Sequence, residues 1–154
     1  MSLRFEYDKV APKAIRTMYQ MENYIQASSI EFSLRELVKL RASQINGCAY
    51  CIDMHTKEAR AAGETEQRLY GLSVWRETPY YSGRERAALA WTEAQTLLAQ
   101  NDIDDELYDH VRDYFSEQEL VDLTMIIIAI NGWNRIAVGF KMEPGTYEVA
   151  AVGA

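Results

Sequence analysis

The chain has 154 residues, 48% of them hydrophobic and 25% charged, and its formal net charge at pH 7 is −7. A chain of this length and composition is typical of one globular domain, here expected to span 1–154, with a hydrophobic core of its own. The negative charge argues against a nucleic-acid-binding surface and against attraction to acidic membranes.

The start of the chain does not resemble a signal peptide, because Met1 to Asp8 mix apolar, basic and acidic side chains. The most apolar run, 121–130, is short and contains Asp122 and Thr124, so we do not expect it to span a membrane. We therefore expect a cytoplasmic protein. In that reducing compartment a pair of cysteines is more typical of redox chemistry or metal binding than of a structural crosslink.

Apolar residues recur at a spacing near 3.6 along the chain, which predicts an all-α fold, a bundle of about six to eight helices. In chain order, the predicted helices cover about 12–30, 33–46, 48–63, 66–74 and 82–100, and two more begin after Asp104 and Ser116. Capping boxes are predicted at Ser33-Leu34-Arg35-Glu36 and at Ser116-Glu117-Gln118-Glu119. The Asn46-Gly47 pair is predicted to end the helix that starts at Ser33.

The sequence contains an internal repeat. Phe32-Ser33-x-x-Glu36-Leu37-Val38-x-Leu40 recurs 83 residues later as Phe115-Ser116-x-x-Glu119-Leu120-Val121-x-Leu123, and Ile45-Asn46-Gly47 recurs 85 residues later as Ile130-Asn131-Gly132. Each copy is expected to form a capped helix that breaks at Asn-Gly and is followed by a second helix. Two related helical hairpins would then pack in one bundle.

The two copies differ where chemistry is expected. The groups Cys48, Cys51 and His55 of the first copy are matched by Trp133, Ile136 and Phe140 in the second. Features that both copies share are predicted to be structural, and features of one copy alone are candidates for function. Asn134-Arg135 in the last helix is expected to anchor that helix through hydrogen bonds to carbonyls or carboxylates.

Cys48 and Cys51 are the two cysteines of the chain, and their spacing at a predicted helix start puts both on one face. A helix N-terminus and a nearby imidazole both favour the thiolate, which is the reactive form. The pair could divide attack and resolution between two sulfurs. Two alternatives stay open, namely buried cysteines that only fill space and a metal site formed with His55 and Glu36.

His55 follows Cys51 by one helical turn, where an imidazole can take the thiol proton and return it to a leaving group. Cys48 is expected at the exposed helix start, nearly two turns from His55. Glu36 has a structural role in the capping box, yet a chain reversal at Asn46-Gly47 would also bring it within about a turn of His55. Its carboxylate could there orient and charge the ring. Tyr50 is expected near the sulfurs or their entrance.

The segment Glu36…Leu40-Arg41-Ala42-Ser43-Gln44-Ile45-Asn46-Gly47-Cys48-x-x-Cys51-x-x-x-His55, followed by Ala59 and Gly63, resembles the alkylhydroperoxidase D-like core of the carboxymuconolactone decarboxylase family. The resemblance is strongest over 36–63 and extends to about 98, so the redox core is expected over about 33–98. It implies an all-helical fold, commonly assembled as trimers or hexamers. It also implies a thiol-dependent peroxidase or disulfide reductase without a bound cofactor.

By position, the resemblance implies that Cys51 attacks the peroxide, that Cys48 resolves the sulfenic acid, and that His55 and Glu36 form a proton relay. Well-studied members of this family have a second histidine immediately before the second cysteine, where this chain has Tyr50. A phenol is a poor proton acceptor at neutral pH, so this departure bears on peroxidase efficiency. The decarboxylase branch of the family generally lacks the two cysteines, so decarboxylase activity is less expected for this chain than thiol chemistry.

The sequence therefore predicts an antioxidant-type thiol peroxidase whose partners are a hydroperoxide and an external dithiol or protein reductant. The alternatives are a disulfide reductase, a non-enzymatic oligomeric module that senses redox state or binds metal, and a decarboxylase-type enzyme. A homo-oligomer, trimer or hexamer, is expected because the run 121–130 is apolar on nearly every side. A small bundle buries such a helix most easily against a neighbouring subunit.

Overall fold

A computed structural model describes residues 2–150, and over that range the chain is helical with no β-strand. The helices are α1 (Tyr7–Val10), α2 (Pro12–Gln26), α3 (Phe32–Asn46), α4 (Ala49–Ala61), α5 (Glu66–Gly71), the 3₁₀-helix η1 (Leu72–Glu77), α6 (Gly83–Thr96), α7 (Asp105–Arg112) and α8 (Glu117–Phe140). The all-α fold predicted from the sequence is confirmed.

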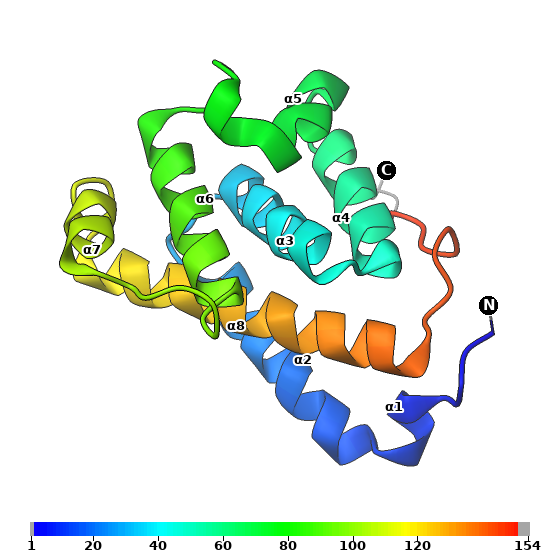
Figure 1. Cartoon of the computed structure of the whole chain (residues 1–154). Helices are drawn as coiled ribbons and strands as arrows, with labels where there is room; N and C mark the ends of the chain where they lie inside the picture. Colours follow the sequence, from blue (N-terminus) through cyan, green and yellow to red (C-terminus); the bar gives the residue numbers. More distant parts are fainter. Residues whose placement is uncertain (1, 151–154) are drawn as a thin grey trace.

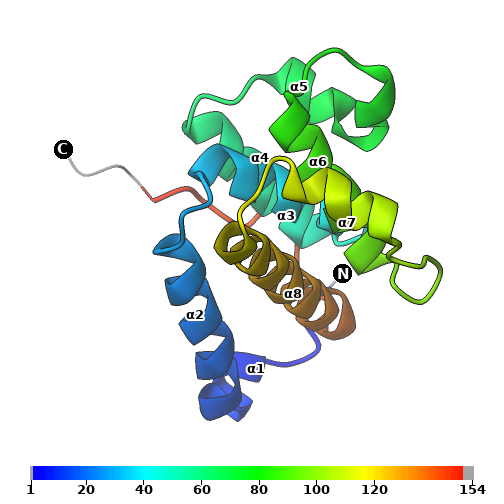
Figure 2. The same cartoon turned by 90° about the vertical axis from the view of Figure 1, so that its left-hand side faces the viewer.

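Helix α3 lies at the centre of the molecule, with α4, α6 and α8 packed around it and α2 packed against α8 (Figures 1 and 2). Its residues Leu37, Val38 and Ala42 are completely buried. Full burial of a leucine or valine side chain contributes roughly 1.5–3 kcal/mol. Residues 36–40, in the first copy of the repeat, are all buried, so the centre of α3 is packed on every side.

Most of the predicted helix starts are confirmed. Ser82 and Ser116 form complete capping boxes with Glu85 and Glu119, and the Asp104 side chain caps α7. The predicted ends are less accurate: α2 stops at Gln26 and α6 at Thr96, each four residues early, and the helix predicted over 66–74 is two elements, α5 and η1. Helix termini fray, and boundaries predicted from a sequence are accurate only to within about two to four residues.

The capping box predicted at Ser33 is wrong. Helix α3 begins at Phe32, its N-cap is Glu31, and no side chain caps it. Arg84 donates to both carboxylate oxygens of Glu31, at 3.1 and 3.2 Å. Ser33 is exposed within the first turn, while the Glu36 side chain turns into the interior and is 5% exposed. Glu36 is therefore released from the capping role that the sequence suggested.

The two Asn-Gly pairs of the repeat behave differently. Gly47 ends α3 in the left-handed conformation (φ +66°), as predicted. Asn131-Gly132 does not break the chain, because α8 continues through it to Phe140. The Asn131 side chain donates to the Ile127 carbonyl one turn earlier (2.9 Å) and so bonds within the helix. The second predicted hairpin is thus one continuous helix.

Helix α8 is long and apolar enough to cross a membrane by length and composition, although 44% of its most apolar stretch is buried inside the chain. Central helices of soluble proteins have the same properties, and α8 packs against α2, α3 and α6. Val121 and Ile128 are 57% and 50% exposed, so one apolar face of α8 is uncovered within residues 2–150. Burial of this face by a second subunit stays a prediction.

Candidate active site

The turn between α3 and α4 positions the two cysteines. The Cys48 backbone N–H donates to the Ser43 carbonyl (3.0 Å), and the Cys48 sulfur accepts from the Cys51 backbone N–H (3.3 Å), which makes Cys48 the N-cap of α4. Because the positive end of a helix dipole lies at its N-terminus, negative charge on sulfur is favoured here. The predicted placement of the cysteines at a helix start is confirmed.

Cys48 and Cys51 are joined by a disulfide, and their Cα atoms are 5.3 Å apart. The expectation that Cys48 lies at an exposed helix start is wrong, since Cys48 is 1% and Cys51 is 3% exposed. Cys48 packs with Ala42 of α3 and with Ile130 and Ala137 of α8. The α8 helix therefore covers the start of α4 and keeps water away from this sulfur.

His55 and Glu36 meet as the reversal at Gly47 predicted. The His55 Nδ1 atom lies 2.8 Å from the Glu36 Oε2 atom, and both residues are almost fully buried, at 6% and 5% exposed. A carboxylate only accepts hydrogen bonds, so we assign the ring hydrogen to Nδ1. Nε2 is then the nitrogen that can exchange a proton. The catalytic role of this pair stays a prediction.

A polar cluster fixes the α3–α4 turn against α8. Asn134 is buried, donates to the Ser43 hydroxyl (3.0 Å) and accepts from the Asn46 side chain (2.9 Å). Asn46 also donates to Asn131, its counterpart in the repeat (2.9 Å). Asn134 thus anchors the last helix, but its partners are a hydroxyl and an amide instead of the predicted carbonyls or carboxylates. Arg135 donates to the Asn131 carbonyl one turn earlier in α8 itself (2.9 Å), so the expectation that it anchors this helix is wrong.

A pocket of about 350 Å³ opens next to the disulfide. Its lining comes from both ends of the chain and from α2, α3, α4 and α8: Tyr7, Tyr19, Glu22, Gln26, Lys39, Tyr50, Cys51, Met54, His55, Ile130, Trp133, Ala137, Met142 and Tyr147. Cys51 and His55 reach this pocket, whereas Cys48 and Glu36 lie behind them. The pocket therefore distinguishes the two sulfurs.

A buried ion pair that was not predicted from the sequence lies in the same pocket. Lys39 of α3 donates to Glu22 of α2 (3.0 Å), and the other Glu22 oxygen accepts from the indole N–H of Trp133 on α8 (3.1 Å). Lys39 is only 8% exposed. A comparison of the two copies of the repeat could have pointed to Lys39, because the equivalent residue of the second copy is Asp122.

The segments at both ends of the described chain cover the pocket. The Tyr7 hydroxyl donates to the Met142 sulfur (3.0 Å), and the Tyr147 hydroxyl donates to Glu58. The Lys57 ammonium donates to the Tyr147 carbonyl (2.9 Å). Burial and the bond to Glu58 raise the pKa of Tyr147, so its phenol stays neutral. Tyr7 and Tyr147 thus hold the two end segments over α4 and α8.

Tyr50 lines the pocket beside Cys51, as predicted. Burial is the main cause that raises the pKa of the Tyr50 phenol above its ordinary value. Tyr50 is therefore protonated at neutral pH and can donate a hydrogen bond but not take a proton. Of the pocket residues, His55 is the better candidate for a proton acceptor.

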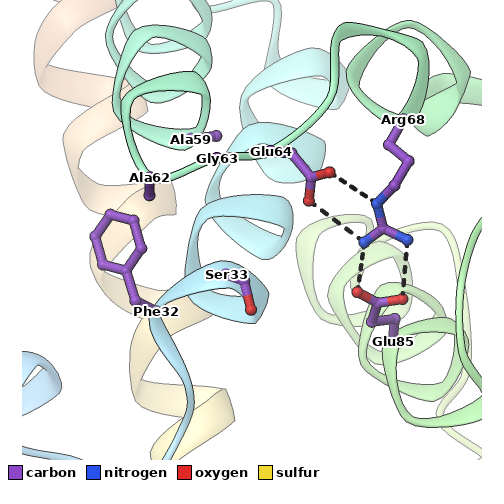
Figure 3. Close-up of a pocket in the computed structure, with 8 residues that line it drawn as sticks. All are labelled: Phe32, Ser33, Ala59, Ala62, Gly63, Glu64, Arg68 and Glu85. Carbon is purple, nitrogen blue, oxygen red and sulfur yellow. Dashed lines mark hydrogen bonds and ion pairs between the residues drawn. The ribbon is translucent and has the colours of Figure 1, made fainter.

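A second, smaller pocket of about 240 Å³ lies at the other end of α4 (Figure 3). Figure 3 shows Arg68 held between the carboxylates of Glu64 and Glu85. The charged side chains of this pocket are paired with one another, and neither a cysteine nor a histidine lines it. We therefore place the candidate active site at the disulfide.

Metal binding gains no support from this geometry. Among residues 2–150, no group of three or more His, Cys, Asp or Glu side chains is arranged to hold a metal ion. His110, the other histidine, is exposed and packs edge-on against Tyr114, with 5.6 Å between the ring centres.

The site lies in a region that is similar to a known family. The model of the carboxymuconolactone decarboxylase family matches residues 11–94, which include Glu22, Glu36, Lys39, both cysteines and His55. The uncharacterized protein YdfG of Bacillus subtilis is 50% identical over 138 residues, which cover 90% of this chain and 94% of YdfG. The α8 wall of the pocket lies outside the matched range.

Solved structures agree with the fold. ATU0492 of Agrobacterium tumefaciens, a protein of unknown function that its description associates with antioxidant defence and AhpD, superposes with a TM-score of 0.91. It is 45% identical, and the match covers 95% of this chain and all of ATU0492. An uncharacterized peroxidase-related protein from Silicibacter, 22% identical, has a TM-score of 0.77 over 87% of this chain and 71% of its own, which supports the fold alone.

Proposed function

Because the chain belongs to the carboxymuconolactone decarboxylase family, and a relative with its fold is associated with AhpD and antioxidant defence, we propose that it is a thiol-dependent peroxidase of the alkylhydroperoxidase D-like type. One observation carries the proposal. A disulfide-forming pair at the start of α4 lies one turn from a buried histidine–glutamate pair, and Cys51 and His55 open into the same pocket.

The reaction uses the two sulfurs in turn. In the reduced protein the Cys51 thiolate attacks one oxygen of a hydroperoxide; the S–O bond forms as the O–O bond breaks. Cys51 is oxidised to a sulfenic acid, and the peroxide is reduced to an alcohol or water. The Cys48 thiol then attacks the Cys51 sulfur, water leaves, and the disulfide forms. An external dithiol reduces the disulfide and completes the cycle.

Burial and access support these roles. Cys51 lines the pocket, whereas Cys48 packs behind it against Ala42 and Ile130. A peroxide in the pocket therefore meets the Cys51 sulfur first. His55 lies one helical turn after Cys51 and takes the thiol proton through Nε2, while the Glu36 carboxylate stabilises the imidazolium that forms.

The test is a thiol titration of the reduced protein before and after a stoichiometric pulse of tert-butyl hydroperoxide. We expect both thiols of each chain to disappear, and a dithiol reductant to sustain peroxide consumption. A protein whose thiols survive the pulse is not a peroxidase. If such a protein still reduces a small disulfide at the expense of a dithiol, it is the disulfide reductase that the sequence left open.

The proposal includes an assembly and a location. We propose a homo-oligomer, trimer or hexamer, in which the exposed apolar side chains Val121 and Ile128 of α8 are covered by a neighbouring subunit. Light scattering at low micromolar concentration tests this, and a monomer of 17.7 kDa would contradict it.

We also propose that the protein acts in the cytoplasm, where protein dithiols are available as reductants.

A further inference from the structure

The Lys39–Glu22 ion pair has no role in the chemistry described so far, yet it faces the pocket that Cys51 and His55 reach. The side chains of Lys39 and Glu22 are only 10% and 15% exposed. Removing two charges from water costs free energy, and apolar residues of similar size often pack as well or better. A buried ion pair in a reactive pocket is therefore a candidate for function.

The internal repeat separates packing from chemistry at this position. Asp122 occupies the equivalent place in the second copy, is buried, and accepts from Tyr24 of α2 (2.6 Å). A polar contact to α2 is thus present in both copies and is structural. Lys39 of the first copy differs from Asp122 in two respects. It is positively charged, and it reaches the pocket that contains Cys51.

Lys39 has unused hydrogen-bonding capacity. An ammonium group has three N–H donors, and within residues 2–150 the Lys39 ammonium has one recorded partner, Glu22. Trp133 holds that partner in place by donating to its second oxygen. The remaining N–H donors are available to a molecule in the pocket.

From this geometry, and resting on the proposed peroxidase function, we propose that Lys39 donates a hydrogen bond to the leaving oxygen of an organic hydroperoxide. When Cys51 attacks the outer oxygen, the electron pair of the O–O bond moves to the inner oxygen, which becomes an alkoxide and takes a proton from the imidazolium of His55. A fixed ammonium stabilises charge that develops on this oxygen. Because Glu22 balances the charge of Lys39, Lys39 stabilises a neutral bound hydroperoxide less than it stabilises the charged transition state.

The test compares oxidants that differ in their leaving groups. An alkyl hydroperoxide must expel a basic alkoxide, whereas peroxyacetic acid expels a stable carboxylate that needs little help. Lys39→Met should lower the rate of Cys51 oxidation by tert-butyl hydroperoxide about 100-fold, the usual effect of losing one such donor. The loss with peroxyacetic acid should be much smaller, and alkylation of Cys51 by iodoacetamide should be unchanged.

Two further variants control for packing. Lys39→Arg keeps the charge and should retain most of the rate with tert-butyl hydroperoxide. Asp122→Asn changes the equivalent position of the second copy and should leave both oxidation rates unchanged. If Lys39→Met does not fold, the double variant Lys39→Met, Glu22→Gln removes both charges, leaves no unpaired carboxylate and keeps an acceptor for Trp133, and the same pattern of rates is expected from it.

The outcomes are distinct. A wild-type protein that reacts with neither oxidant overturns the peroxidase proposal and this inference with it. A reactive wild type combined with an unchanged rate in the neutral Lys39 variant, or with equal losses for the two oxidants, overturns the assignment of Lys39 alone.

Discussion

The two copies of the repeat are alike in sequence, but in the structure they differ at their helix starts and above all at their Asn-Gly pairs. In the first copy Gly47 ends α3 and a new helix begins, whereas α8 of the second copy runs straight through Gly132. The copies still touch through equivalent residues, because Asn46 donates to Asn131. Their surroundings differ: Val38 of α3 is completely buried, and its counterpart Val121 is 57% exposed.

This difference shows how one helix break creates the candidate active site. A new helix N-terminus after Gly47 provides the positive end of a dipole, and both sulfurs lie over it. The unbroken α8 instead supplies Ile130, Trp133 and Ala137 to the wall of the pocket. One copy thus carries the disulfide and the histidine–glutamate pair, and the other contributes to the wall of the pocket beside them.

The largest expected effect comes from removing the sulfurs that distinguish the first copy. Cys51→Ser should abolish peroxide consumption, because Cys51 is the sulfur that reaches the pocket. Cys48→Ser should stop turnover after one attack and leave a sulfenic acid on Cys51. A sulfenic-acid-specific probe followed by peptide mapping locates the modified residue. A label on Cys48 in the Cys51→Ser variant would reverse the assignment of the two roles.

The second prediction compares Glu36 with Glu119, which occupy equivalent positions of the repeat. Glu36→Gln keeps an acceptor for His55 but removes the charge that stabilises an imidazolium. The rate of Cys51 oxidation should fall roughly tenfold or more, while the free energy of unfolding should fall by less than about 1 kcal/mol. Stopped-flow oxidation and urea unfolding measure the two quantities.

Glu119→Gln is the matched control for Glu36. Glu119 accepts from the Ser116 backbone N–H and binds Arg84, far along the chain from either cysteine. Its replacement should leave the oxidation rate unchanged. Equal rates for Glu36→Gln and wild type would reduce Glu36 to a structural partner of His55.

The sequence predicted much of the site because its geometry is local. The spacing of Cys48, Cys51 and His55 fixes their common helix, and one chain reversal brings Glu36 to His55. The pocket was not predictable in this way. Lys39 meets Glu22 across two helices and Trp133 comes from a third, so the contact depends on packing rather than on spacing.

The failed predictions also have physical causes. Ser33-x-x-Glu36 has the pattern of a capping box, but Glu31 is held by Arg84 and the helix starts before Ser33. Asn131-Gly132 has the pattern of a helix end, but the packing of α8 against α2, α3 and α6 outweighs the weak preference of two residues. Tertiary contacts decided both cases.

The third prediction replaces the glycine of each Asn-Gly pair by alanine. Gly47→Ala should destabilise the protein by about 1 kcal/mol, because φ is +66° and an alanine is strained there. Gly132→Ala should be neutral or stabilising by up to about 1 kcal/mol, since alanine is the better helix former. Its Cβ would meet the Met18 Cε atom at 2.9 Å, the mobile end of a side chain that can move aside.

Urea unfolding of the two glycine variants gives the comparison directly. Opposite signs are expected for the changes in the free energy of unfolding. A large loss in Gly132→Ala would mean that the Met18 contact is rigid and that α8 needs this glycine for packing against α2.

The smallest expected effect concerns the capping box that the second copy alone has. The Ser116 backbone N–H and the Arg84 guanidinium lower the pKa of Glu119, against a smaller opposing effect of burial. A carboxyl whose pKa is lowered in the folded state stabilises the protein above its ordinary pKa, and this contribution disappears as the pH falls through the lowered value.

Glu119→Gln can still cap the Ser116 N–H but cannot titrate. Wild type should therefore be more stable than Glu119→Gln at pH 7, by less than about 1 kcal/mol because the side chain is partly exposed. Thermal unfolding at a series of pH values from neutral to acid should show this difference in stability shrinking below the ordinary pKa of 4.5. If the difference in stability is the same at every pH, it comes from packing instead of charge.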